Sequence, residues 1–124
     1  MGQFKGGSGS GSGGGFNFSR GTSYLITVGI NDGDTNCQPI PTAQALAYIE
    51  RVCSVTFPNG YTVIESVTGY TDQRTGKPYV QTSFVINVLN TTEAEVLECV
   101  SLYSQRFNQR ILVERFNVEY TYYK

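Results

Sequence analysis

Three polar side chains occupy positions where a binding or catalytic site could form. Gln81 lies in the middle of a predicted strand, Tyr70 lies near the end of the preceding strand, and Gln109 lies at the end of a predicted helix. The chain contains no histidine, which excludes Ser-His-Asp and Cys-His chemistry. Any catalysis must therefore use amides, tyrosine, carboxylates, lysine or backbone groups. On patterning alone, the same three residues are also explained as polar side chains in contact with solvent.

The sequence offers no recognisable metal or cofactor site. Cys37, Cys53 and Cys99 are far apart and form no C-x-x-C pair, which argues against a disulfide framework and a structural zinc site. Asp32–Asn36 begins like a calcium loop, but the twelfth loop position is Ala43 instead of the bidentate glutamate. We therefore expect neither a metal nor a cofactor, and we predict that Cys53 and Cys99 are small buried residues on helix faces.

Composition narrows the class of partner. The formal net charge is −1 and only 15% of the residues are charged, without a basic patch, so nucleic acid is not an expected partner. No apolar run approaches the ~20 residues of a membrane span, and the N-terminus lacks the apolar segment of a secretory signal. We therefore expect no membrane partner and a cytoplasmic protein, or one that is packaged into a virion from a cytoplasm.

Residues 1–21 differ in composition from the rest of the chain. Glycine and serine dominate residues 6–15, and such a segment has too few apolar side chains to form a core. We predict a flexible tail or linker over 1–21 and one domain over 22–124. Phe4, Phe16 and Phe18 flank the glycine-rich run, so a docking arm that contacts a neighbouring subunit stays open as an alternative.

Hydrophobic periodicity predicts six elements after the tail. Thr42, which follows two prolines, is predicted to be the N-cap of one helix, and the capping box Thr92–Glu95 indicates the start of a second one. The expected elements are a strand over 24–30, a helix over 43–55, strands over 61–70 and 79–89, a helix ending near 107, and a strand over 111–123. This order, β-α-β-β-α-β, predicts an α+β ferredoxin-like plait, in which two helices cover one face of a four-stranded antiparallel sheet.

The predicted sheet keeps one face free of helices, and the alternation of side chains over 79–89 places Gln81 on that face. Val85 on the third strand and the aromatic residues Phe116, Tyr120 and Tyr122 on the fourth strand belong to a face that is too apolar to contact only water. Such a face favours contact with another subunit of a homo-oligomer. A base-stacking platform is the alternative, but it would require flanking cations, and the sheet offers mainly Arg115.

Two stretches carry a resemblance to known families. FPNGYTVIESVTGYTDQRTGKPYVQTSFVINVL, followed by YSQRFNQRILV, resembles an uncharacterised family of small bacterial ferredoxin-like domains. The shared features include an F-P-D-G-type turn and a Tyr-x-x-x-Phe-x-Gln helix end. The same segment more faintly resembles the phage S-adenosylmethionine lyases, through Glu65-Ser66, Thr68-Gly69-Tyr70, the strand at Gln81, and Gln109 before Ile111-Leu112-Val113.

The lyase resemblance implies a trimer with its site between subunits, where S-adenosylmethionine is split into methylthioadenosine and homoserine lactone. It implies that Tyr70 is the active-site tyrosine, that Gln109 is the amide of the site, and that Gln81 stands where the family has a glutamate. A carboxylate binds the ammonium group of the substrate through a charge-assisted hydrogen bond. Because the amide of Gln81 is neutral, the resemblance implies a different ligand, poor catalysis or lost chemistry.

Three hypotheses for function follow. The first is a small ligand-binding or lyase-like protein related to S-adenosylmethionine lyases, with Tyr70 and Gln81 in catalytic roles and Gln109 as a further ligand-binding residue. The second is a non-enzymatic structural or assembly protein of a virion that uses the glycine-rich arm. The third is a phage sponge for a nucleotide signal, which uses the same pocket between subunits without chemistry.

Overall fold

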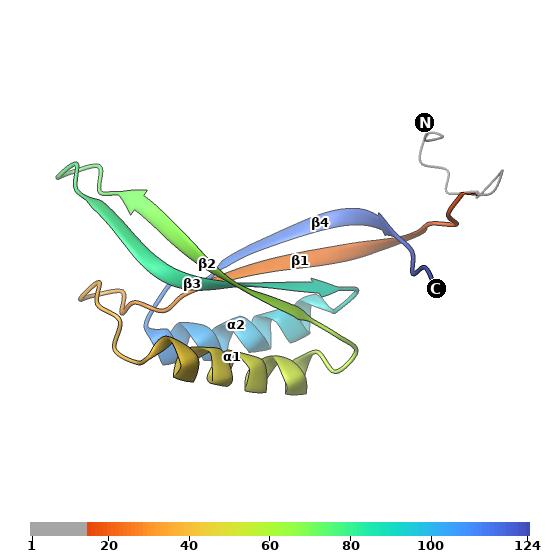
Figure 1. The fold of residues 1–124 in the computed structure, drawn as a ribbon, viewed down its shortest axis with the longest axis horizontal. Coiled ribbons are helices and arrows are strands. Elements are labelled where there is room, and N and C mark those ends of the chain that lie inside the picture. Colours follow the sequence, from red (N-terminus) through yellow and green to blue (C-terminus); the bar gives the residue numbers. More distant parts are fainter. Residues whose placement is uncertain (1–14) are drawn as a thin grey trace.

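The computed structural model describes residues 15–124 and contains the six elements in the predicted order (Figure 1). They are β1 (Ser19–Gly29), α1 (Thr42–Thr56), β2 (Thr62–Thr71), β3 (Pro78–Leu89), α2 (Glu93–Phe107) and β4 (Leu112–Tyr120). The strands form one sheet in the order β2-β3-β1-β4, and every neighbouring pair is antiparallel. Both helices lie on the same face of the sheet. The fold is therefore an α+β ferredoxin-like plait.

The first strand is longer at its N-terminal end than the apolar pattern predicts. It begins at Ser19, which pairs with Tyr120 of β4, so residues 19–21 of the predicted tail belong to the sheet. Gly21 allows this pairing because a Cβ at that position would lie 2.3 Å from Oδ1 of Asn90. That oxygen accepts a hydrogen bond from the backbone N–H of Thr22. The rest of the predicted tail, residues 1–14, lies outside the described residues.

The two helices begin in different ways. Thr92 and Glu95 form the predicted capping box at the start of α2. The prediction that Thr42 caps α1 is wrong, because Pro41 occupies the N-cap and Thr42 is the first helical residue. The carbonyl of Pro41 accepts the N–H groups of Gln44 and Ala45, and the hydroxyl of Thr42 accepts a hydrogen bond from Gln38 instead. Proline readily adopts the extended backbone that precedes a helix, and α1 therefore begins without a side-chain cap.

The core fills the space between the helices and one face of the sheet. Its fully buried residues include Ile26, Val28, Phe84 and Ile86 from the central strands and Ile49, Cys53, Cys99 and Tyr103 from the helices. The hydroxyl of Tyr103 donates to the carbonyl of Ile49 at 2.8 Å and lies 3.2 Å from Sγ of Cys53. Burial raises the pKa of this hydroxyl, so the group remains a neutral donor that joins α2 to α1. The prediction that Cys53 and Cys99 are buried is confirmed.

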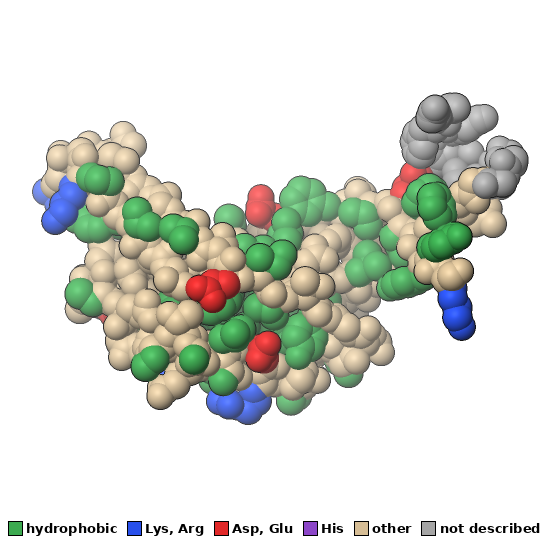
Figure 2. Space-filling view, in the orientation of Figure 1, with side chains coloured by type: hydrophobic (Ala, Val, Ile, Leu, Met, Phe, Trp, Pro, Cys, Tyr) green, Lys and Arg blue, Asp and Glu red, His purple; other side chains and the backbone are tan. Residues whose placement is uncertain are grey.

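The other face of the sheet is uncovered and concave. The β2–β3 hairpin projects beyond the helices at one end, and the β1–β4 ribbon projects beyond them at the other end (Figure 1). The uncovered face carries apolar side chains that include Ile64, Leu112 and Phe116, each more than two-fifths exposed. Figure 2 shows hydrophobic side chains along this side of the molecule between the two projecting ends. In residues 15–124, no helix is long and apolar enough to cross a membrane.

We predict that Tyr103→Phe lowers the free energy of unfolding by about 1–2 kcal/mol, because it removes a buried hydrogen bond between the two helices. Urea unfolding monitored by circular dichroism measures this loss as a lower midpoint at an unchanged slope. The matched control is Tyr123→Phe, since Tyr123 is 86% exposed and its variant should unfold like the parent. Equal midpoints for Tyr103→Phe and the parent would show that the hydroxyl does not stabilise the core.

Candidate functional site

Gln81 lies on the uncovered face of β3, as its strand position predicts, and its side chain crosses over the neighbouring strand β1. The strand register places Ser83 opposite Gly29. A Cβ at Gly29 would lie 2.5 Å from the amide group of Gln81, which is closer than two such atoms can approach. The absence of a side chain at Gly29 therefore creates the space in which the Gln81 amide lies, at the C-terminal end of β1.

Hydrogen bonds to the backbone of Asn31 fix the orientation of two side-chain amides. The N–H of Asn31 donates to Oε1 of Gln81 at 3.0 Å. Nε2 of Gln109 donates to the carbonyl of Asn31 at 2.6 Å and to Oε1 of Gln81 at 2.9 Å. Because a backbone N–H can only donate and a carbonyl can only accept, neither amide can be reversed without losing a hydrogen bond. Gln81 therefore presents its NH2 group to a ligand, and Gln109 presents its carbonyl oxygen.

Asn108 holds the loop that carries Gln109 in place. It ends α2 in the left-handed conformation, with φ 51° and ψ 54°, which asparagine tolerates better than most residues. Its side-chain NH2 donates to Asp32 at 3.1 Å and to Asp34 at 3.0 Å. Its backbone carbonyl accepts a hydrogen bond from the N–H of Gly33 at 2.8 Å. The hydrogen bond from Asn108 is the main reason that the pKa of Asp32 is lowered. The β1–α1 loop and the α2–β4 connection are thus joined directly.

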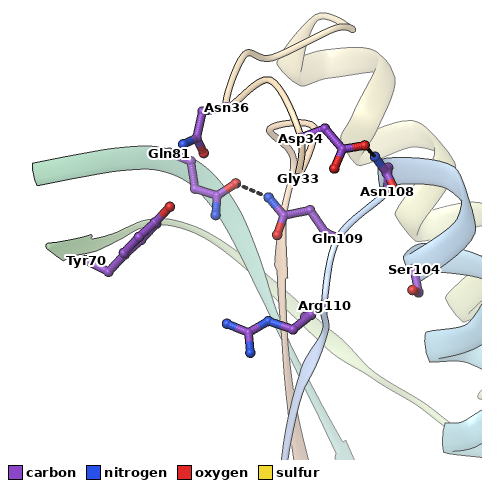
Figure 3. Close-up of a pocket in the computed structure, with 9 residues that line it drawn as sticks. All are labelled: Gly33, Asp34, Asn36, Tyr70, Gln81, Ser104, Asn108, Gln109 and Arg110. Atoms are coloured by element: carbon purple, nitrogen blue, oxygen red, sulfur yellow. Dashed lines mark hydrogen bonds between the residues drawn. The ribbon is translucent and has the colours of Figure 1, made fainter. Parts of the chain in front are cut away.

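These elements line an open pocket of about 480 Å³ beside the hairpin end of the uncovered face (Figure 3). The structure brings the three predicted residues, Tyr70, Gln81 and Gln109, together in its lining. The complete lining is Gly33, Asp34, Asn36, Tyr70, Gln81, Ser104, Asn108, Gln109 and Arg110. Tyr70 is 54% exposed, and its ring stacks on Tyr79 with a centroid separation of 5.4 Å. The pocket is therefore built from β2, β3, α2 and two loops.

Arg110 supplies the cation of this pocket, and it is not among the site residues predicted from the sequence. Figure 3 shows its guanidinium projecting between Tyr70 and Gln109, below Gln81. Within residues 15–124 the only ion pair joins Arg115 to Glu93, so Arg110 has no carboxylate partner there. A usable signal was present, because the alternation of β4 assigns Leu112 to the uncovered face and therefore assigns Arg110 to the same side. Within residues 15–124, no group of three or more side chains is placed to bind a metal ion.

The comparisons with known proteins identify a shared fold. No protein-family model and no curated protein matches the chain. The structure is similar to a phage SAM lyase in complex with S-methyl-5'-thioadenosine, with a TM-score of 0.52, 18% identity, and coverage of 84% of this chain and 93% of that one. A phage SAM lyase in the apo state gives a TM-score of 0.57 at 15% identity, with coverage of 85% and 94%. The resemblance to phage lyases is thus confirmed for the fold.

We predict that Gly29→Ala lowers the free energy of unfolding by about 1–3 kcal/mol, because the new methyl group displaces the Gln81 amide from its hydrogen bonds. Thermal or urea unfolding measures the loss, and Gly15→Ala is the control because nothing lies within 4 Å of a Cβ at that position. In a Gln81→Ala background the same Gly29→Ala change should cost less, since the clash is gone. An equal cost in both backgrounds would show that the Gln81 side chain is not what Gly29 accommodates.

Proposed function

We propose that this chain is a subunit of a homo-oligomer, a trimer by resemblance, which binds a small ligand in the Tyr70–Gln81–Gln109 pocket and is functionally related to phage S-adenosylmethionine lyases. The observation that carries the proposal is the meeting of three sequence-distant polar groups in one pocket, with two of them oriented by the backbone of Asn31. A solvated polar residue needs no such orientation. A ligand-binding amide does need it, because a reversed amide would exchange donor and acceptor.

A partner subunit is proposed because the pocket of one subunit is open. Tyr70 is more than half exposed, pairs with Tyr79 close to the turn of the β2–β3 hairpin, and forms one wall of the pocket. The uncovered face of the sheet carries exposed Leu112 and Phe116 and, at the end opposite the hairpin, half-buried Tyr120. A second copy placed on this face would bury its apolar groups and close the open side of the pocket.

We predict that Phe116→Asp or Tyr120→Asp converts the oligomer into monomers, because an unpaired carboxylate is costly to bury in an apolar interface. Sedimentation velocity on the parent and both variants measures the change. Val55→Asp is the control, since Val55 is exposed on α1, on the opposite side of the sheet. A parent that sediments as a monomer would refute the self-association, and variants that sediment like an oligomeric parent would remove this face from the interface.

The proposed chemistry needs positioning more than acid or base groups. In S-adenosylmethionine the carboxylate oxygen attacks the carbon next to the sulfonium, the carbon–sulfur bond breaks, and sulfur keeps the electron pair. The products are homoserine lactone and neutral methylthioadenosine, with no water consumed and no proton transferred. Holding the substrate in the folded conformation is therefore the main contribution of a protein. Tyr70, Gln81 and Gln109 are the residues to which we assign this role.

The side-chain amide of Gln81 disfavours efficient cleavage of S-adenosylmethionine. Its Oε1 already accepts hydrogen bonds from Asn31 and Gln109, so a substrate ammonium would meet the NH2 group, which is a donor. A carboxylate in the same place would retain both bonds with one oxygen and offer the other oxygen to the ammonium. A hydrogen bond to a charged partner is worth about 1 kcal/mol more than a neutral one. The proposed consequence is weak or absent catalysis in the parent protein.

We predict that Gln81→Glu binds S-adenosylmethionine up to about tenfold more tightly than the parent, or releases methylthioadenosine that the parent does not. Calorimetry measures the binding, and chromatography detects the product. Gln44→Glu makes the same chemical change on α1, outside the pocket lining, and should behave like the parent. If neither the parent nor Gln81→Glu binds at millimolar ligand or forms product, the lyase-like proposal is wrong.

A structural role in a virion is the second candidate, and one observation favours it. At the end of the β1–β4 ribbon, Phe16 contacts Phe18 and Tyr123 at centroid distances of 5.8 and 5.9 Å, while Tyr122 is 84% exposed. Such an aromatic cluster suits contact with another protein subunit. The sponge for a nucleotide signal remains a form of the first proposal, in which the pocket binds without chemistry. A cytoplasmic location accompanies the ligand-binding roles, and the virion accompanies the structural one.

A further inference from the structure

Hydrogen-bond donors dominate one side of the pocket. The NH2 group of Gln81 faces the pocket because its carbonyl oxygen is occupied by Asn31 and Gln109. In Figure 3 the hydroxyl of Tyr70 points toward Gln81, and the guanidinium of Arg110 extends into the space below both. An amide NH2, a phenol and a guanidinium all donate hydrogen bonds, and the guanidinium also carries a permanent positive charge.

The two residues that flank Arg110 in the sequence determine the direction of its side chain. Gln109, the preceding residue, is fixed to the backbone of Asn31 at 2.6 Å. The following residue, Ile111, packs against the core, so Arg110 must point away from the helices, toward the uncovered face. No carboxylate of residues 15–124 forms an ion pair with it. The cation is therefore directed into the pocket while its charge remains available to a ligand.

Only one acidic side chain lines the pocket, and it is already engaged. Asp34 accepts a hydrogen bond from Asn108 at 3.0 Å, and Figure 3 shows it beyond Gln109, on the opposite wall from Tyr70. Asp32, the other carboxylate of this loop, accepts hydrogen bonds from Asn108 and from the N–H groups of Asp34 and Thr35. Both carboxylates are oriented by these hydrogen bonds, and Asp34 lies away from the wall of Tyr70, Gln81 and Arg110.

We propose that Tyr70, the Gln81 NH2 group and Arg110 form a subsite for an anionic group, a carboxylate or a phosphate, of the ligand. This inference rests on the proposed ligand-binding function and adds to it the charge of the ligand. It also supplies a second reason for weak catalysis. A substrate carboxylate held by a guanidinium is stabilised in the ground state and loses reactivity as the internal nucleophile, so the subsite binds such a ligand without cleaving it.

The test compares three ligands on three proteins by calorimetry. S-adenosylmethionine carries a carboxylate, ADP carries phosphates, and methylthioadenosine carries neither. Arg110→Gln should weaken the binding of the anionic ligands by about ten- to a hundredfold, the range for a hydrogen bond to a charged group, and leave methylthioadenosine unchanged. Arg51→Gln, which removes the same charge from α1 outside the pocket lining, is the control and should bind all three like the parent. Preference of the parent for ADP or for S-adenosylmethionine identifies phosphate or carboxylate as the anion.

Pyrophosphate separates failure of this inference from failure of the proposed function. In nuclear magnetic resonance titrations, pyrophosphate should shift the side-chain NH2 signals of Gln81 in the parent and in Arg51→Gln, and should not shift them in Arg110→Gln. That result supports the subsite even if no adenosine ligand binds, in which case only the lyase-related function fails. Equal affinity of the parent and Arg110→Gln for S-adenosylmethionine or ADP, or the absence of any pyrophosphate shift in the parent, overturns the subsite.

Discussion

The hydrogen bonds around Asn31 determine how the pocket is built. The backbone of this one residue donates to Gln81 and accepts from Gln109, and the two amides are themselves joined at 2.9 Å. Three segments that are far apart in the sequence are thereby held together at the end of a sheet. The network has one consistent arrangement of donors and acceptors, so it fixes the polarity of the pocket as well as its shape.

The elements of the fold could be predicted because their signals are local. Alternation along β3 predicted which face carries Gln81, and the Thr92–Glu95 box predicted the start of α2. The first residues of β1 were not predicted, because Ser19–Gly21 join the sheet only through pairing with β4, which is a long-range interaction. Thr42 was assigned wrongly because Pro41 begins α1 without a side-chain cap, and a sequence pattern does not distinguish adjacent candidates for one cap.

The site was only partly predictable, for a related reason. The positions of Tyr70, Gln81 and Gln109 near the ends of elements and a family resemblance both indicate a site, but residue types and spacing alone also fit three unrelated surface positions. The roles of Gly29 and Asn108 depend on close contacts across the sheet and between loops, and such contacts leave no periodic signal. The alternation of β4 indicates the face of Arg110, but this residue precedes the strand, and its place in the pocket depends on the loop that carries Gln109. Packing between distant segments therefore decides the site, although local pattern decides most of the elements.

The residue at position 81 can change the chemistry of the pocket without changing the fold. A glutamine and a glutamate have nearly the same shape, and either accepts the hydrogen bonds of Asn31 and Gln109 with one oxygen, so the plait can form with both. They differ in the atom presented to a ligand, which is a donor in one case and a negatively charged acceptor in the other. Beside Arg110, which has no ion-pair partner within residues 15–124, the donor fits the proposed anion subsite, whereas a carboxylate would offset the charge of the arginine. The proposed ligand preference thus depends on which side chain stands at position 81, and the fold accommodates either one.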